Sequence, residues 1–136
     1  MEKLEIICLD SDILIDFLRG DPLTTEKINQ LEEGFEITTT TINLFKLYYS
    51  AYKSKKADKN VKAVDELTTR FKALKFTNKS SDITGKILAE LEKIGELIDF
   101  RDVMVAGIIL ETNIMLYTRN TEHFKRIKGI NLYQTL

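Results

Sequence analysis

The sequence predicts an α/β protein, a three-layer α/β/α sandwich whose mainly parallel central sheet has about four to five strands. Two observations support this prediction. Short runs of apolar and β-forming residues alternate along the chain with stretches in which apolar residues recur at helical spacing. The first run, residues 6–9, is apolar throughout, which is typical of a strand covered on both faces. Strands that alternate with helices favour parallel pairing, with crossover helices on both faces of the sheet.

Length and composition limit the classes of protein to which this chain can belong. With 136 residues, of which 43% are hydrophobic and 30% charged, the chain is expected to form a single domain over residues 1–136. No apolar run is long enough to span a bilayer, and no signal-peptide pattern is visible, so we expect a cytoplasmic protein without a membrane partner. The single cysteine, Cys8, is predicted to be a buried hydrophobe, and the single histidine, His123, a surface or packing residue.

The first predicted strand is followed directly by acidic residues. Asp10, Ser11 and Asp12 supply the side-chain oxygens that begin a helix, and Gly20 suits the left-handed position that ends it. Asp10 then lies at the carboxyl end of a strand, where ligands and catalytic groups collect in open α/β sheets. Taken alone, this stretch leaves Asp10 as either a helix cap or a catalytic carboxylate. It also resembles the start of haloacid-dehalogenase-like phosphatases.

The next segments continue the alternation. Asp21 followed by Pro22 predicts the start of a second helix, which ends at Gly34. The β-prone residues 35–39 predict the second strand.

A third helix is predicted to begin at Thr40 or Thr41 and to run into an exposed connection at 53–60. Five residues are predicted to form its inward face: Leu44, Phe45, Leu47, Tyr48 and Ala51. Apolar residues then repeat at helical spacing over 61–74, and residues 74–76 predict the third strand.

The last third of the chain contains one ambiguous segment. A helix is predicted to begin at Ser80 or Ser81 and to end at Gly95. The eight apolar residues 103–110 are compatible with a strand, which their β-branched residues favour, or with a helix buried all round.

The chain is predicted to close with two strands around a short helix. Residues 114–117 and 130–133 predict the strands, and between them Asn120 is predicted to cap a helix that runs to Ile127.

The net charge of −1 hides a basic segment. Residues 46–79 contain nine Lys and one Arg against three acidic residues, a net charge of +7. This segment is either the footprint of a polyanionic partner or an ordinary solvated helix surface.

Three stretches, in family order, resemble the PIN-domain ribonucleases and especially the VapC toxins of toxin–antitoxin pairs. They are LDSDILIDFLRG at 9–20, GELIDFRDVMVA at 95–106, and LYTRNTEHF at 116–124 with Gly129 and Ile130 after it. The resemblance implies a PIN-like fold in which 102–110 is helical, and an endoribonuclease that uses Mg²⁺ or Mn²⁺. It also implies an RNA substrate, a homodimer, and an antitoxin partner that can place a basic side chain in the acidic pocket.

The resemblance implies which residues of this sequence form the site. Asp10 and Asp102 match the first and third acids, and are the implied catalytic residues and metal ligands. Asn120 matches a fourth catalytic position, with a helix cap as the alternative. Asp12 and Asp99 flank these residues in the sequence and are expected to support the site. The chemistry is reasonable, because Mg²⁺ prefers carboxylates, waters and substrate phosphate, and lowers the pKa of its bound water.

The second block departs from the family. Residues 41–51, TINLFKLYYSA, resemble the second-acid helix, but Lys46 stands where the family has Glu. A unit charge ~5 Å away, at an effective dielectric constant of ~20, is worth about 3 kcal/mol, so this exchange is expected to weaken cation binding by orders of magnitude. The ammonium can instead take the place of the cation. Lys46 then marks either an altered or inactive natural relative or a substitution that tames a toxic enzyme.

Two functions from different classes follow. The first is a metal-dependent endoribonuclease, the toxin of a toxin–antitoxin pair, weakened or inactivated by Lys46. The second is a catalytically inactive PIN-like module that binds RNA or protein. The phosphatase lacks support because no convincing Lys and second acidic motif follow Asp12. A receiver domain lacks support because residues 74–76 supply no phospho-acceptor Asp.

Overall fold

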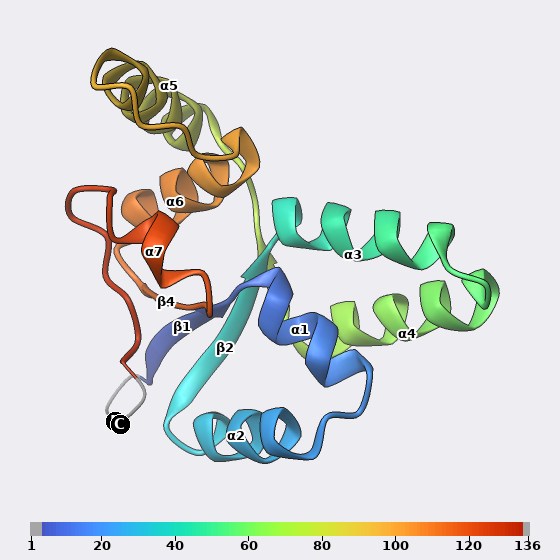
Figure 1. The fold of residues 1–136 in the computed structure, drawn as a ribbon. Helices are drawn as coiled ribbons and strands as arrows, with labels where there is room; N and C mark the ends of the chain where they lie inside the picture. Colours follow the sequence, from blue (N-terminus) through green and yellow to red (C-terminus); the bar gives the residue numbers. More distant parts are fainter. Residues whose placement is uncertain (1–3, 135–136) are drawn as a thin grey trace.

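The computed structural model describes residues 4–134 and contains a four-stranded parallel sheet with the order β3-β2-β1-β4 (Figure 1). The strands are β1 (Glu5–Leu9), β2 (Phe35–Thr40), β3 (Lys72–Leu74) and β4 (Met115–Tyr117). Because all pairs are parallel, the carboxyl ends of the strands share one edge of the sheet. The predicted α/β class and parallel sheet are confirmed.

Helices cover both faces of this sheet. In Figure 1, α5, α6 and α7 lie on one face, and α1 to α4 lie on the other. The helices are α1 (Ser11–Leu18), α2 (Pro22–Glu32), α3 (Thr41–Lys53), α4 (Ala57–Arg70), α5 (Asn78–Lys93), α6 (Phe100–Thr112) and α7 (Thr121–Phe124). The predicted three-layer arrangement is therefore confirmed.

The central strand β1 divides its side chains between two hydrophobic cores. Ile7 and Leu9 are fully buried in the core on the α1–α4 face, whereas Cys8 points into the core on the other face, with Leu116 and Phe124. This alternation follows from the two-residue period of a strand. Cys8 is thus a buried small hydrophobe, as predicted.

The ambiguous run 103–110 lies within α6. Its β-branched residues favour a strand, but tertiary packing stabilises a helix here. The helix is buried on nearly all sides, between the sheet and α5. Seven of its residues are buried: Asp102, Val103, Val105, Ala106, Gly107, Ile108 and Ile109. The helix implied by the family resemblance is confirmed. Even this apolar helix is short, and no helix within residues 4–134 has the length and apolar character needed to cross a membrane.

One predicted strand is shifted along the chain, and another is reduced to a single bridge. The third covers Lys72–Leu74 rather than 74–76, because Leu74 pairs with Thr40, the last residue of β2, and later residues have no strand beside them. The predicted strand 130–133 is only an isolated parallel bridge between Leu132 and Leu116, since β4 is too short to support a longer ladder.

Several helices begin at a side-chain cap. Thr40 is the cap of α3, because its hydroxyl accepts a hydrogen bond from Asn43 N at 3.0 Å. Asp21 caps α2 as predicted, and Gly20 has the expected positive φ of 78°. The start predicted for α5 is wrong: the helix begins at Asn78, and Thr77 is its cap.

The predicted connection at 53–60 is also too long. The helix α3 continues through Lys53 and α4 begins at Ala57, so three residues join the two helices. The Asn60 side chain donates to Ser54 Oγ at 2.8 Å and closes this turn. The predicted helical spacing over 61–74 ends at Arg70, where β3 approaches.

Candidate functional site

A pocket of about 380 Å³ lies at the carboxyl edge of the sheet. It is lined by all the site residues that the sequence singled out: Asp10, Asp12, Lys46, Asp99, Asp102 and Asn120. These residues come from the end of β1, from α1, α3 and the start of α6, and from the loop after β4. The parallel sheet therefore brings distant parts of the chain to one place.

Asp10 is both a helix cap and a wall of the pocket. Its Oδ1 accepts from Ser11 N at 2.9 Å and its Oδ2 accepts from Thr118 Oγ1 at 2.7 Å, while the residue is only 4% exposed. Burial, followed by repulsion from Asp12, raises the pKa of Asp10 to about 6, against the hydrogen bonds and the Lys46 charge that lower it. The two interpretations of Asp10 are thus compatible.

Buried polar side chains fix the peptide that precedes Asp10. The carbonyl of Leu9 accepts from Thr39 Oγ1 at 2.8 Å and from Asn43 Nδ2 at 3.3 Å. Thr39 and Asn43 have no exposed surface, so their donors are committed to the protein. The junction between β2 and α3 thereby holds the end of β1 in position. The sequence indicated only a β-prone run of threonines here.

Lys46 and Asp102 form the central ion pair of the pocket. Lys46 Nζ lies 2.9 Å from Asp102 Oδ1, and the two side chains are 20% and 11% exposed. The second oxygen, Oδ2, accepts from Asn120 Nδ2 at 3.3 Å. Both carboxylate oxygens of Asp102 therefore have a donor from the protein.

Asn120 does not cap its helix. It precedes α7, but its side chain makes no capping hydrogen bond and turns to Asp102 instead, so the capping alternative is wrong. His123 Nδ1 lies 2.8 Å from Asn120 Nδ2 and 3.5 Å from Asp102 Oδ2. Its side chain is 42% exposed, as predicted for a surface histidine, but its contact with Asn120 was not predicted from the sequence. The spacing of three residues from Asn120, one helical turn, was the available signal.

The two supporting acids have different partners. Asp12 Oδ2 accepts from Arg119 N at 3.0 Å and ties the loop after β4 to α1. Asp99 accepts from Arg101 Nε at 3.2 Å and from Arg101 Nη2 at 2.9 Å. These hydrogen bonds from Arg101 lower the pKa of Asp99. Asp99 therefore orients Arg101, which also lines the pocket together with Tyr49. Neither Arg101 nor Tyr49 was predicted from the sequence.

The donor set does not fit a divalent cation as it stands. Across residues 4–134, no group of three or more His, Cys, Asp or Glu side chains is placed to hold a metal ion. The Lys46 ammonium occupies one oxygen of Asp102, where it would repel Mg²⁺ or Mn²⁺. Two carboxylates, Asp10 and Asp102, remain as the implied ligands.

Similar proteins are found by sequence and by structure. A tRNA(fMet)-specific endonuclease VapC from Shigella flexneri is 27% identical over 122 residues, covering 90% of this chain and 92% of that protein. Ribonuclease VapC2 from Rickettsia felis is 29% identical over 128 residues, covering 93% and 96%.

A solved structure of VapBC2 from Rickettsia felis, bound to a DNA fragment from its promoter, superposes with a TM-score of 0.87 and 26% identity. The match covers 96% of this chain and 99% of that one. The PIN domain family matches residues 7–130, a span that begins within β1 and contains β4 and every pocket residue described above. The chain therefore belongs to the PIN-domain family.

Proposed function

We propose that this chain is an endoribonuclease of the toxin type whose metal-dependent activity is suppressed by Lys46. One observation carries the proposal: Asp10 and Asp102 meet in one pocket at the sheet edge, and Lys46 Nζ lies 2.9 Å from Asp102. The relatives named as ribonucleases support an RNA substrate. We also propose that the protein is a single domain and that it acts in the cytoplasm.

Lys46 acts in this proposal as an internal cation. It lowers the negative charge of the pocket and satisfies one oxygen of Asp102, so Mg²⁺ or Mn²⁺ would have to displace a bonded ammonium. Two charges ~5 Å apart at an effective dielectric constant of ~20 interact by about 3 kcal/mol. We therefore expect cation binding by this chain only at millimolar concentrations, and almost no cleavage of RNA.

A charge series at position 46 tests the proposal. Lys46→Gln removes the positive charge, whereas Lys46→Glu also adds a carboxylate beside Asp10 and Asp102. Calorimetric titration with Mn²⁺ should show affinity rising from Lys to Gln to Glu, and metal-dependent RNA cleavage should appear with Glu. Adding Asp102→Asn to the Glu variant should remove both gains. Rapid cleavage by the unchanged chain, on the order of 1 s⁻¹, would contradict the proposal.

The second candidate function is a PIN-like module that binds RNA or protein without catalysis. The Lys46–Asp102 ion pair favours it, because a bonded pair in the pocket is a stable alternative to a metal site. This module predicts that Lys46→Glu gains neither Mn²⁺ affinity nor cleavage, while RNA binding or partner binding remains. The charge series thus separates the two functions.

The proposed partners are an antitoxin and a second copy of the chain. The resemblance to VapC toxins implies both, and the similar Rickettsia felis structure is a VapBC2 assembly. Expression of the Lys46→Glu variant should slow growth unless an antitoxin is supplied. Light scattering should show a dimer, and a species of only 15.7 kDa would contradict the dimer.

A further inference from the structure

We propose that Arg101, Tyr49 and Phe45 form a nucleotide clamp that holds one unpaired nucleotide of the RNA at the rim of the pocket. The guanidinium of Arg101 binds a backbone phosphate, and the paired rings of Tyr49 and Phe45 stack on the base. The ligand class, RNA, rests on the proposed function. The clamp goes further by naming the residues that hold the RNA and by requiring that the RNA is single-stranded at this position.

Arg101 is held ready for an anion. Asp99 bonds Nε and Nη2 along one side of the guanidinium, which leaves its other N–H groups for a second acceptor. The side chain is 39% exposed and lines the pocket. Lys46 and Arg101 are the two cationic residues among those lining the pocket, and Lys46 is committed to Asp102. A phosphate that approaches these acids therefore meets Arg101 as its available cation.

The aromatic pair lies on the outer side of α3. The rings of Phe45 and Tyr49 are stacked, with centroids 6.3 Å apart and an interplanar angle of 23°. They are 55% and 53% exposed, so the prediction that Phe45 faces the core is wrong. Two large rings stacked with each other in solvent leave apolar surface uncovered. An unpaired base would cover it, since base–aromatic stacking accepts any base.

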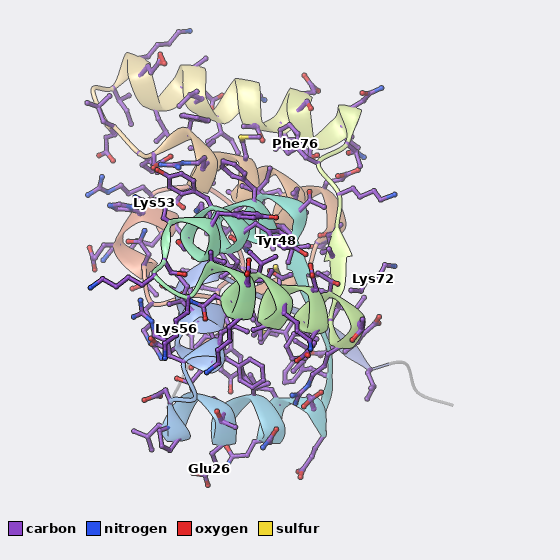
Figure 2. All side chains as sticks on the ribbon, turned by 90° about the vertical axis from the view of Figure 1, so that its right-hand side faces the viewer. Glu26, Tyr48, Lys53, Lys56, Lys72 and Phe76 are labelled. Carbon is purple, nitrogen blue, oxygen red and sulfur yellow. The ribbon has the colours of Figure 1, made fainter. Side chains whose placement is uncertain are left out.

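The charge near the rings suits a nucleic acid strand. Lys53 Nζ lies 4.9 Å from the centroid of the Tyr49 ring, and further exposed lysines follow at the turn into α4. Figure 2 shows Lys53 and Lys56 on the same side of the molecule, whereas Lys72 lies on the opposite side. The basic segment 46–79 is therefore divided, and the part close to the clamp continues from Tyr49 along α3. A phosphate backbone can follow it away from the pocket.

A binding experiment without metal tests the clamp. The probe is a short single-stranded RNA that contains 2-aminopurine, whose fluorescence is quenched on stacking, titrated with the full chain in EDTA. Tyr49→Ala should weaken binding by about 5- to 100-fold and remove the quenching, while Tyr49→Phe should keep both. Arg101→Gln should weaken binding and lower the slope of log affinity against log salt by about 0.7, the value for one phosphate contact on a single strand.

The control is Lys86→Gln, which removes an exposed charge from α5 on the other face of the sheet. It should leave the affinity, the salt slope and the quenching close to those of the unchanged chain. Circular dichroism checks that each variant is folded, which these exposed positions permit.

Three results would overturn the clamp. The first is unchanged RNA affinity and quenching in both Tyr49→Ala and Phe45→Ala. The second is unchanged RNA affinity and quenching in both variants together with loss of the dimer. That result would make this surface an interface between two copies of the chain. The third is no RNA binding by the unchanged chain at low salt. Cleavage by the Lys46→Glu variant decides separately whether the proposed endoribonuclease also fails.

Discussion

Asp10 is expected to lower the stability of the protein at neutral pH. Its pKa in the folded chain is about 6, above the value of about 3.9 for an unfolded Asp, so the folded state binds more protons between these values. The free energy of unfolding must then fall as pH rises from about 4 to 6, and the full cost is present at pH 7.

Asp10→Asn should therefore stabilise the protein by about 1–3 kcal/mol at pH 7.5, because the amide oxygen can still accept from Ser11 N and no charge is buried. The gain should vanish near pH 3.5, where Asp10 is already neutral. Urea unfolding at the two pH values measures the difference. An equal effect at both would show that burial of the Asp10 charge is not the cause.

The Lys46–Asp102 pair should be energetically coupled in the folded chain. In a double-mutant cycle with Lys46→Met and Asp102→Asn, we expect an interaction of about 1–3 kcal/mol, since both side chains are largely buried. The matched control is the exposed pair Lys125–Glu122, whose coupling should be at most about 0.5 kcal/mol. Equal coupling in the two cycles would mean that Lys46 is not seated on Asp102 in solution.

The sequence predicts which residues share the pocket better than it predicts their contacts. Asp10 follows a strand, Asp102 begins a helix and Lys46 matches a family motif, and these features suffice to place the three residues together. The hydrogen bonds between Asp99 and Arg101 depend on side-chain conformations that no spacing rule specifies. The contact of His123 with Asn120 had a signal in their three-residue spacing, but the approach of both side chains to Asp102 depends on the path of the loop after β4.

At the scale of helices, the contact between α5 and α6 depends on Gly107. A Cβ added there would lie 2.0 Å from Thr84 Oγ1 and 2.8 Å from the backbone oxygen of Ser80, so the helices would have to separate. Gly107→Ala should destabilise the protein by about 1–3 kcal/mol, measured as the free energy of unfolding in urea.

Gly85 provides the opposite case within α5. It is exposed and a Cβ there meets nothing within 4 Å, so Gly85→Ala should stabilise the protein by up to about 1 kcal/mol through helix propensity. Destabilisation by both substitutions would mean that neither α5 nor α6 tolerates an added methyl group, and would remove the close approach at Gly107 as the explanation.

Helices and strands could be told apart from the sequence where a periodic pattern or a capping residue was present. The residues at which they end could not be predicted. Residues 103–110 carry no useful period because nearly every side is buried, so only the family resemblance indicated a helix. The end of β3 is set by Thr40, which lies far away in sequence and ends β2. Strand ends of this kind depend on tertiary pairing rather than on local propensity.

At the scale of the whole molecule, the uneven charge distribution should govern RNA binding. The net charge is −1, yet residues 46–79 carry +7, so we expect an RNA strand to bind through a few phosphate contacts. With about three contacts, affinity should fall roughly 20-fold between 50 and 200 mM salt. Titrations at both salt concentrations measure this, and unchanged affinity would exclude binding through the phosphate backbone.

The topology was predictable at this scale because alternating strands and helices leave few alternatives. Right-handed crossovers place α1 and α5 on opposite faces and return each strand in parallel. The strand order β3-β2-β1-β4 has no comparable signal in the sequence, and neither does the pairing of Leu132 with Leu116.

The ion pair in the pocket also has a genetic consequence. Codons for Lys and Glu differ by one base, AAA or AAG against GAA or GAG, so a single transition in the gene would replace the Lys46 ammonium with a carboxylate facing Asp102. A population carrying this gene would produce such variants continually. The proposed endoribonuclease predicts that a variant cell survives only while a neutralising partner is expressed, so sequencing of survivors after that partner is withdrawn should show Lys46 retained.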